Sequence, residues 1–213
     1  MADTERRRST INVARLTMWK MTSDTSTATV YEETPRTWEK SLAAVKYTPK
    51  MQTNEQYGDG QKVEDFIAKD GGDIDITVNG FGAGDAEYLF GETNDNGTEI
   101  SSANDIVPYE MVAYFTKRPD GKINLYKFPK TKFMPEGEDS KQQEGTNVSY
   151  GTANLKGTYS PLISSGADSY KRYGVDPTAD AEIVEKWFTE AAYHGQSEST
   201  SDTPVDSGDE AGG

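Results

Sequence analysis

The first residues that could support chemistry form the glycine-rich run Gly80–Gly84, which reads GFGAG. It lies between a predicted strand and a predicted short helix, where a dinucleotide-binding loop would lie. That loop requires the pattern G-x-G-x-x-G, but Asp85 stands at its last glycine position, and a carboxylate there would repel a pyrophosphate. We therefore interpret the run as a strand-to-helix turn with unusual backbone angles, and phosphate binding as the weaker alternative.

The other chemically capable residues do not form a catalytic set. His194 is the only histidine, which excludes a multi-histidine metal site and a histidine dyad, and it is predicted at an exposed helix end. Asp73 and Asp75 lie roughly 7 Å apart on one strand face, without a general base nearby in the sequence. The chain has no cysteine, which excludes disulfides, thiolate catalysis and cysteine-bound zinc. We therefore expect no catalytic residues, no metal ligands and no cofactor.

The composition predicts a thin hydrophobic core. Leu, Ile, Val and Phe form roughly 15% of the chain, under the ~20% below which highly charged chains are often disordered. Twelve Tyr and three Trp partly offset the shortage, and burial against other copies would offset it further. The net charge of −14 argues against a general nucleic-acid-binding protein. No apolar run approaches the ~20 residues of a membrane span, so we expect a soluble chain that is made in the cytoplasm.

The centre of the predicted fold is a β-hairpin. Its first strand, Tyr109–Thr116, is joined to the second by the turn sequence Pro119-Asp120-Gly121. Both strands carry large apolar residues on both faces, which is typical of a strand that is covered on both sides. We therefore expect the hairpin in the middle of a sheet with a layer packed on each face. Its predicted core residues are Met111, Val112, Tyr114, Phe115, Ile123, Leu125, Tyr126 and Phe128.

Further elements are predicted from alternating side chains and turn residues. The clearest strand is Gly72–Asn79, in which Asp73, Asp75 and Thr77 alternate with three apolar residues, so that one face is solvated. Helices are predicted at Ala83–Phe90, closed by Gly91, and at Pro177–Tyr193, with Pro177 in the first turn. Other strands are predicted at Arg15–Met21, Thr29–Tyr31, Leu42–Tyr47 and twice within 147–160, and loops or linkers at Glu92–Asp105, Pro135–Gly145 and Gly166–Asp176.

The predicted domain organisation is a flexible N-terminal arm over residues 1–12, one domain over 13–194, and an acidic tail over 195–213 that we expect to be disordered. Within the domain, Thr48–Asp70 is predicted as a long loop, because Pro49 should end the preceding strand. Loops of this length are usually functional. We predict that it joins subunits, with a loop folded back on its own domain as the alternative. Its predicted contact residues are Met51, Tyr57, Val63, Phe66 and Ile67.

The order of these segments resembles a known family. The stretches that carry the resemblance are LAAVKYTPKMQTNEQYGDG at 42–60, GGDIDITVNGF with the short helix after it, VPYEMVAYFTKRPDGKINLYKFPKTKF at 107–133, and ANLKGTYSP at 153–161. In this order they are similar to the major tail proteins, or tail tube proteins, of long-tailed bacteriophages of the phi13 and TP901-1 type. The resemblance covers about residues 15–165, and the acidic tail departs from it.

The resemblance implies a mainly β (α+β) fold, a β-sandwich or barrel-like sheet with a short helix and a C-terminal helix, similar to the Hcp ring proteins. It implies a structural virion protein without enzymatic activity, located in the phage tail. Six copies would form a ring, and stacked rings would form the tail tube around the tape measure protein. Tail terminator and distal tail proteins would bind the tube ends, and genomic DNA would pass through the lumen without specific binding.

Two points stay open at the level of sequence. We predict that Asp73 and Asp75 line the lumen, where a wall with the charge of DNA would reduce adhesion. The alternative is that this face points outward. For the whole chain, the alternative function is a monomeric β-sandwich that serves as a binding or adhesin module.

Overall fold

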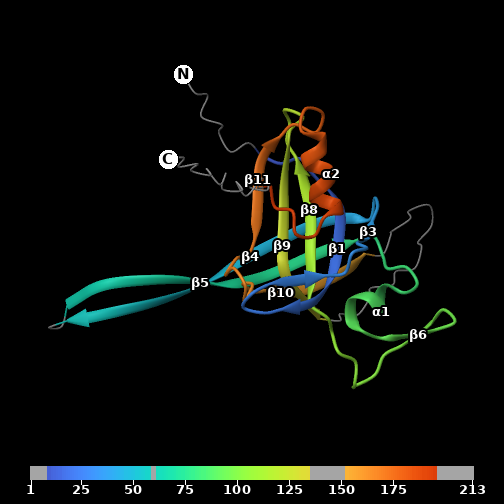
Figure 1. Ribbon diagram of the computed structural model, residues 1–213, viewed down its shortest axis with the longest axis horizontal. Coiled ribbons are helices and arrows are strands. Elements are labelled where there is room, and N and C mark those ends of the chain that lie inside the picture. The colour runs from blue at the N-terminus through green and yellow to red at the C-terminus, as the bar shows by residue number, and fades with distance from the viewer. Residues whose placement is uncertain (1–8, 59–60, 135–151, 196–213) are drawn as a thin grey trace, which may run out of the picture.

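The computed structural model describes residues 9–58, 61–134 and 152–195, without the side chains of 54–66. Figure 1 shows a body built from one antiparallel sheet, with a helix packed on it and a long hairpin that projects to one side. The expectation of a mainly β chain with two helices is confirmed.

The main sheet contains nine of the described strands, and its central path is β2-β1-β8-β9-β10-β5-β4. β3 also pairs with β1, and β11 also pairs with β9. Two short strands, β6 and β7, form a separate hairpin beside helix α1. The bounds are β1 Asn12–Asp24, β2 Thr29–Tyr31, β3 Arg36–Trp38, β4 Leu42–Gly58, β5 Gln61–Val78, α1 Asp85–Phe90, β6 Thr93–Asp95, β7 Thr98–Ile100, β8 Glu110–Lys117, β9 Ile123–Met134, β10 Ala153–Tyr159, β11 Tyr170–Val175 and α2 Ala181–Thr189.

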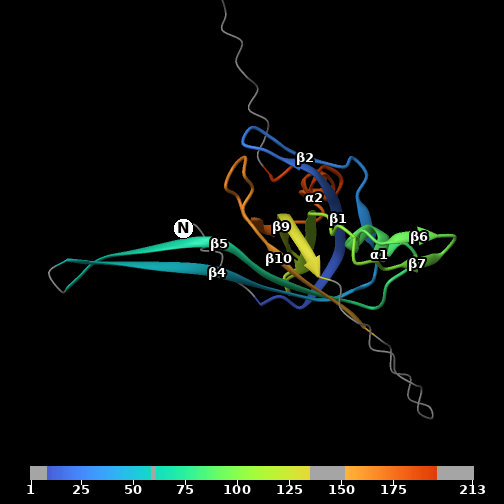
Figure 2. The same cartoon turned by 90° about the horizontal axis from the view of Figure 1, so that it is seen from below.

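The central hairpin, β8 and β9, is covered on both faces, as its sequence predicts. Val112, Tyr114, Tyr126 and Phe128 lie in the larger core, around which the sheet curves. Figure 2 shows this curvature from below. The remaining members of that core come from β1, β3, β5, α1, the end of β9 and β10: Leu16, Met18, Trp38, Ile74, Ile76, Val78, Leu89, Phe90, Phe133, Ala153, Leu155 and Tyr159.

The opposite face of the hairpin packs against α2. Met111, Ile123 and Leu125 are buried there together with Trp187 and Phe188 of the helix. Phe115 is half-buried and packs at the border of this second core, so it contributes less burial than predicted. The two cores explain how a chain with few aliphatic residues folds, since aromatic side chains supply much of the buried area.

Several predicted element boundaries are wrong. The C-terminal helix begins at Ala181 rather than at Pro177, because a turn precedes it in which the Asp176 carboxylate accepts two backbone N–H bonds. The predicted linker Gly166–Asp176 contains β11, and the predicted polar loop Glu92–Asp105 contains the β6–β7 hairpin. Of the two β segments predicted within 147–160, one is β10, and the other lies outside the described residues, as does the loop Pro135–Gly145.

The GFGAG run is a strand-to-helix turn, as interpreted. Gly80 and Gly84 adopt positive φ angles of 120° and 80°. The turn is fixed by Asp85, the residue that breaks the dinucleotide pattern. Its buried carboxylate accepts hydrogen bonds from Trp38 Nε1 at 3.0 Å and from the Gly82 N–H at 2.6 Å, and it forms an ion pair with Arg36. The carboxylate thus holds α1 against β3.

Candidate functional site

The most prominent feature of the structure is an arm formed by the outer parts of β4 and β5. The two strands pair from Leu42 and Val78 at the body to Gly58 and Gln61 at the far end. Only the part of β5 from Gly72 to Val78 also pairs with β10. Beyond Gly72 the two strands leave the sheet and project as a two-stranded ribbon (Figures 1 and 2). In this article "the arm" means residues 50–70.

The prediction of a long loop over Thr48–Asp70 is therefore wrong. This segment continues the strand that was expected to stop at Pro49. Proline is tolerated there because β4 is an edge strand, which pairs only with β5 in the described part of the chain. A loop of this length without secondary structure would be uncommon in a compact domain. The segment is instead formed by two strands that pair regularly through their backbones.

The base of the arm depends on a glycine. Gly71 has a φ of +64°, and a Cβ atom at this position would lie 1.9 Å from the carbonyl oxygen of Tyr159. The register of the β4–β5 pair also shifts here, between Pro49 and Met51. A bulge of this kind bends a strand and increases its twist, so the arm leaves the sheet at this point.

One face of the arm carries exposed apolar side chains. Met51 is the cross-strand partner of Lys69, and Thr53 is the partner of Ile67, so these four residues lie on the same face. Met51 is 59% exposed and Ile67 60% exposed. Of the other residues predicted to contact a neighbouring subunit, Tyr57, Val63 and Phe66 belong to the same strands, but their side chains lie outside the described residues.

The predicted solvated face of β5 is present, but its charge is mixed. Asp73 and Asp75 are half-exposed on the outer face of the sheet, opposite the buried Ile74 and Ile76. Lys50 forms an ion pair with Asp73 at 2.6 Å. Lys46 of β4 and Lys156 of β10 are the register partners of Asp75 on its two sides. A lumen lined by this face would alternate in charge instead of being uniformly acidic, and its placement in a lumen stays a prediction.

A buried lysine connects the central hairpin to the end of α2. Lys127 is fully buried, and its Nζ donates to the carbonyl oxygens of Glu190, Ala191 and Tyr193 at 3.0, 3.3 and 2.7 Å. It also lies over the rings of two buried tryptophans, Trp19 and Trp187. Burial lowers the pKa of Lys127 to about 7, and the Glu190 charge opposes this. The acceptors belong to the turn that follows α2, and one of them, the Glu190 carbonyl oxygen, also accepts a hydrogen bond from the Tyr193 N–H.

A buried carboxyl group lies at one end of the larger core. Glu110 of β8 is fully buried, and neither of its carboxylate oxygens has a hydrogen-bond partner. Burial raises the pKa of Glu110 well above its ordinary value, against the lowering effect of Lys20 and Arg36. The hydroxyl of Thr131, which faces Glu110 across the β8–β9 pair, is also buried without a partner. Because burial disfavours the charged form, this environment favours the protonated, neutral carboxyl group.

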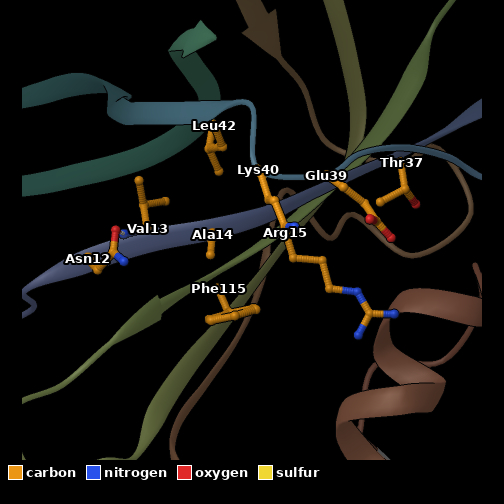
Figure 3. Close-up of a pocket in the computed structure, with 9 residues that line it drawn as sticks. All are labelled: Asn12, Val13, Ala14, Arg15, Thr37, Glu39, Lys40, Leu42 and Phe115. Atoms are coloured by element: carbon orange, nitrogen blue, oxygen red, sulfur yellow. Dashed lines mark hydrogen bonds between the residues drawn. The ribbon is translucent and has the colours of Figure 1, made fainter. Parts of the chain in front are cut away.

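A pocket of about 760 Å³ lies where the start of β1 approaches the start of β4 (Figure 3). Arg15, which has a positive φ of 57°, extends along it towards α2, and its guanidinium lies over the Phe188 ring. Glu39 and Lys40 are the other charged residues of the lining. Its lining holds a single carboxylate, Glu39, and no histidine beside Thr37 or Lys40, so its chemistry does not indicate a reaction. The lining residues are Asn12, Val13, Ala14, Arg15, Thr37, Glu39, Lys40, Leu42 and Phe115.

The remaining sequence candidates do not gather into a site. His194 stacks on Tyr170, and its Nδ1 lies 2.9 Å from the Ala192 carbonyl oxygen. Within residues 9–58, 61–134 and 152–195, no group of three or more His, Asp or Glu residues is arranged to hold a metal ion. Among the same residues, no helix is long and apolar enough to span a membrane.

Comparison with known proteins adds no relative. No protein-family model matches the chain, and no curated protein matches it significantly. The assignment of function therefore depends on the arm, the sheet and the sequence resemblance described above.

Proposed function

We propose that this chain is a structural protein that assembles with copies of itself through the arm, as the tail tube protein of a long-tailed bacteriophage. The single observation that carries the proposal is the arm itself, a two-stranded ribbon that leaves the sheet (Figure 1). It exposes the side chains of Met51 and Ile67. The sequence resemblance to tail tube proteins supports the same conclusion.

A two-stranded ribbon of this kind leaves backbone groups and apolar side chains without partners when it stands alone. An isolated two-stranded hairpin is marginally stable in water, and it presents unpaired backbone groups along both edges. The outer edge of β4 is unpaired among the described strands, and β5 has no second partner beyond Gly72. Burial of a side chain such as Met51 or Ile67 contributes about 1.5–3 kcal/mol. Docking on another copy removes both the unpaired edges and the exposed apolar area.

In the proposed assembly, six copies form a ring and the rings stack into a tube of the kind that the resemblance to tail tube and Hcp proteins implies. The arm joins adjacent subunits or rings. The face with Asp73 and Asp75 lines the lumen, where it surrounds the tape measure protein and later the passing DNA. Alternating lysines and aspartates on this face give few net charges for phosphates to bind, so DNA would not adhere strongly. Terminator and distal tail proteins would bind the two ends.

The test is assembly of the purified protein, followed by negative-stain electron microscopy and sedimentation velocity. We expect hollow filaments of about 10 nm for the wild-type chain, a size that follows from a ring of six small domains. The double variant Met51→Ser/Ile67→Ser should remain folded but should not form filaments. Ile163→Ser is the matched control, because Ile163 is 61% exposed and lies between β10 and β11, outside the arm.

Two outcomes would contradict the proposal. A wild-type protein that stays a monomer at high concentration would favour the monomeric binding module instead. Unchanged filaments from the double variant, with its circular dichroism and melting intact, would show that assembly does not depend on the arm.

A further inference from the structure

We propose that the arm of one copy docks in a groove of the next copy, where the opposed carboxylates of Glu55 and Asp65 bind the guanidinium of Arg15. The seam groove, as we name this surface, lies between residues 10–15 and residues 37–47. This inference rests on the proposed function, and it deepens that function by naming the surface and the ion pair that receive the arm.

The seam groove is an open surface between two strand edges. It contains two pockets, of about 760 and 420 Å³, which share Asn12 and Val13. On this side β1 pairs with β3 only at Leu16–Met18, and β4 pairs only with β5 among the described strands. Both walls therefore present backbone groups without a strand partner in the described part of the chain. Half-buried Leu42 and Val45 add apolar surface against which an arm can pack.

Arg15 is a cation of this groove that lacks an anion. The described residues contain four arginines, at positions 15, 36, 118 and 172, and the last three each donate a hydrogen bond to an oxygen atom. The Arg15 guanidinium instead lies 4.4 Å from the centroid of the Phe188 ring (Figure 3), and no described carboxylate lies within 4 Å of it. Its N–H groups can still bind a carboxylate through two parallel hydrogen bonds.

The backbone of the groove adopts unusual angles at two positions. Arg15 has a φ of 57° and Lys40 a φ of 56°, a region that residues other than glycine rarely adopt. Asn96, the third such residue among those described, belongs to a tight turn with Gly97. Strain of this kind concentrates where a side chain must be held in a functional position. Arg15 and Lys40 outnumber the single carboxylate of the larger pocket, Glu39, so its lining is net positive in a chain of net charge −14.

The arm carries the matching anions. The strand register places Glu55 directly opposite Asp65, on the same face as Met51 and Ile67. Like charges in directly opposed positions destabilise a two-stranded ribbon. Lys69 lies on this face too, but it is four residues from Asp65, roughly 13 Å along the strand. A cation supplied by another copy would remove the repulsion, and the apolar residues of the face would then lie along the groove.

The length of β4 requires that this contact is between copies. Leu42 lines the groove at the start of β4, and Glu55 lies thirteen residues later in the same strand. At about 3.3 Å per residue the two are roughly 40 Å apart, so an arm cannot reach its own Arg15. Figure 1 shows the arm on one side of the body and β3, which leads into the groove, on the other. Such a contact is heterologous, and its repetition produces a closed ring or a continuing stack.

The first test exchanges the charges. Arg15→Glu and the arm variant Glu55→Lys/Asp65→Lys should each associate at least tenfold more weakly than the wild-type protein in sedimentation velocity. A chain that carries all three substitutions should recover association, because each arm again meets a groove of opposite charge. Because ions screen charges that are accessible to solvent, the recovered association should weaken at high salt.

Two control variants make the same changes in charge elsewhere. Glu64→Lys/Asp70→Lys alters the opposite face of the same ribbon, since Glu64 follows the other parity of the β4–β5 register. Lys186→Glu reverses one charge on α2, where the Lys186 side chain is 42% exposed. Both controls should remain folded and associate as the wild-type protein does.

The second test uses the absence of cysteine from the chain. Thr53→Cys/Thr37→Cys places one thiol on the arm face and one in the seam groove. With a flexible bismaleimide crosslinker it should give a ladder of covalent oligomers, whereas a chain with one thiol can give no more than a dimer. Thr53→Cys/Ile163→Cys is the control and should give no ladder. The Ile163 N–H donates to Asp24, which lies nine residues beyond Arg15 along β1, roughly 30 Å away.

The outcomes separate this inference from the proposed function. Tubes from Arg15→Glu that match those of the wild type, or tubes without a crosslinked ladder, would overturn the docking in the seam groove and leave the tube proposal in place. A ladder without tubes on the micrographs would support the docking and contradict the tube. Failure of the triple variant to associate better than the two variants from which it is built would overturn the ion pair of Arg15 with Glu55 and Asp65.

Discussion

Glu110 and Lys127 are two buried ionisable residues whose surroundings differ in the hydrogen-bond partners that they provide. Both side chains are fully buried. Lys127 has three carbonyl acceptors and two aromatic rings around its ammonium group, whereas the carboxylate of Glu110 has no hydrogen-bond partner. An unpaired buried charge costs more free energy than a paired one, so Glu110 is the residue at which ionisation destabilises the fold.

We predict that Glu110→Gln changes the pH dependence of stability. Because burial raises the pKa of Glu110, the folded state binds its proton more tightly than the unfolded state does. This contribution to stability is fully present below the ordinary glutamate pKa and is lost as pH rises through the raised pKa. The wild-type free energy of unfolding should therefore fall above about pH 4.5. Glu110→Gln, which cannot ionise, should be more stable than the wild type by about 1–3 kcal/mol at pH 8.

Urea unfolding followed by tryptophan fluorescence at pH 5 and pH 8 measures this difference. The exposed Glu87→Gln is the control, since it removes the same charge without burial. If the free energy of unfolding changes equally with pH in the wild type and in Glu110→Gln, Glu110 is solvated in the folded protein.

At the scale of elements, we predict that Gly71 sets the direction of the arm. Gly71→Ala introduces a Cβ that meets the Tyr159 carbonyl oxygen at 1.9 Å, in a backbone region that L residues rarely adopt. We expect a loss of roughly 1–3 kcal/mol in stability. Filament formation should also be impaired, because the arm base must shift. The measurement is thermal unfolding by circular dichroism, together with electron microscopy.

Gly97→Ala is the matched control for that change. Gly97 also has a positive φ, of +87°, but no atom lies within 4 Å of the Cβ position. Gly97→Ala should therefore lower the free energy of unfolding only through its unfavourable positive φ angle, without a steric clash. If the two variants melt at the same temperature, the close approach to Tyr159 does not contribute to the loss of stability in Gly71→Ala.

The elements that the sequence predicted well are those with strong alternation. The inner part of β5 and the two faces of β8 and β9 follow directly from the spacing of apolar residues. The arm was missed because Pro49 normally ends a strand, and only the edge position of β4 makes it acceptable. β3 and β11 were missed because they are set by pairing with the distant strands β1 and β9 instead of by local pattern. β6 and β7 pair with each other, and the local signal that was overlooked is the Asn96-Gly97 turn between them.

The buried polar residues were missed for a related reason. Lys127 follows Leu125 by two residues and therefore lies on the same face of β9, which was a signal that this lysine enters the core beneath α2. Its acceptors lie more than sixty residues away, at the end of α2. No local pattern in the sequence indicates that such acceptors will be present.

At the scale of the whole molecule, we predict that removal of residues 196–213 leaves assembly intact. This segment, which lies outside the described residues, contains acidic residues but no lysine or arginine. A chain of that composition buries too little apolar area to take part in a packed contact. Because its loss reduces the net negative charge, filaments of the truncated protein should form at least as readily at low salt. Electron microscopy of the full-length and truncated proteins under the same conditions measures filament formation. Absence of filaments after truncation would contradict the prediction.

The order of strands in the sheet also determines when the protein can fold during its synthesis. β1 and β5 belong to opposite halves of the described sheet, and the hydrogen-bonded path between them runs through β8, β9 and β10, which come later in the chain. When the ribosome has completed β5, the β4–β5 hairpin can form locally, but β1 and β5 still lack the partners that bury their apolar faces. The core closes only after β10 has emerged, because its contacts join segments far apart in the sequence. The nascent chain therefore presents the exposed apolar side chains of the arm before it has a folded body. In the proposed assembly, the rate of synthesis and chaperones would limit premature association.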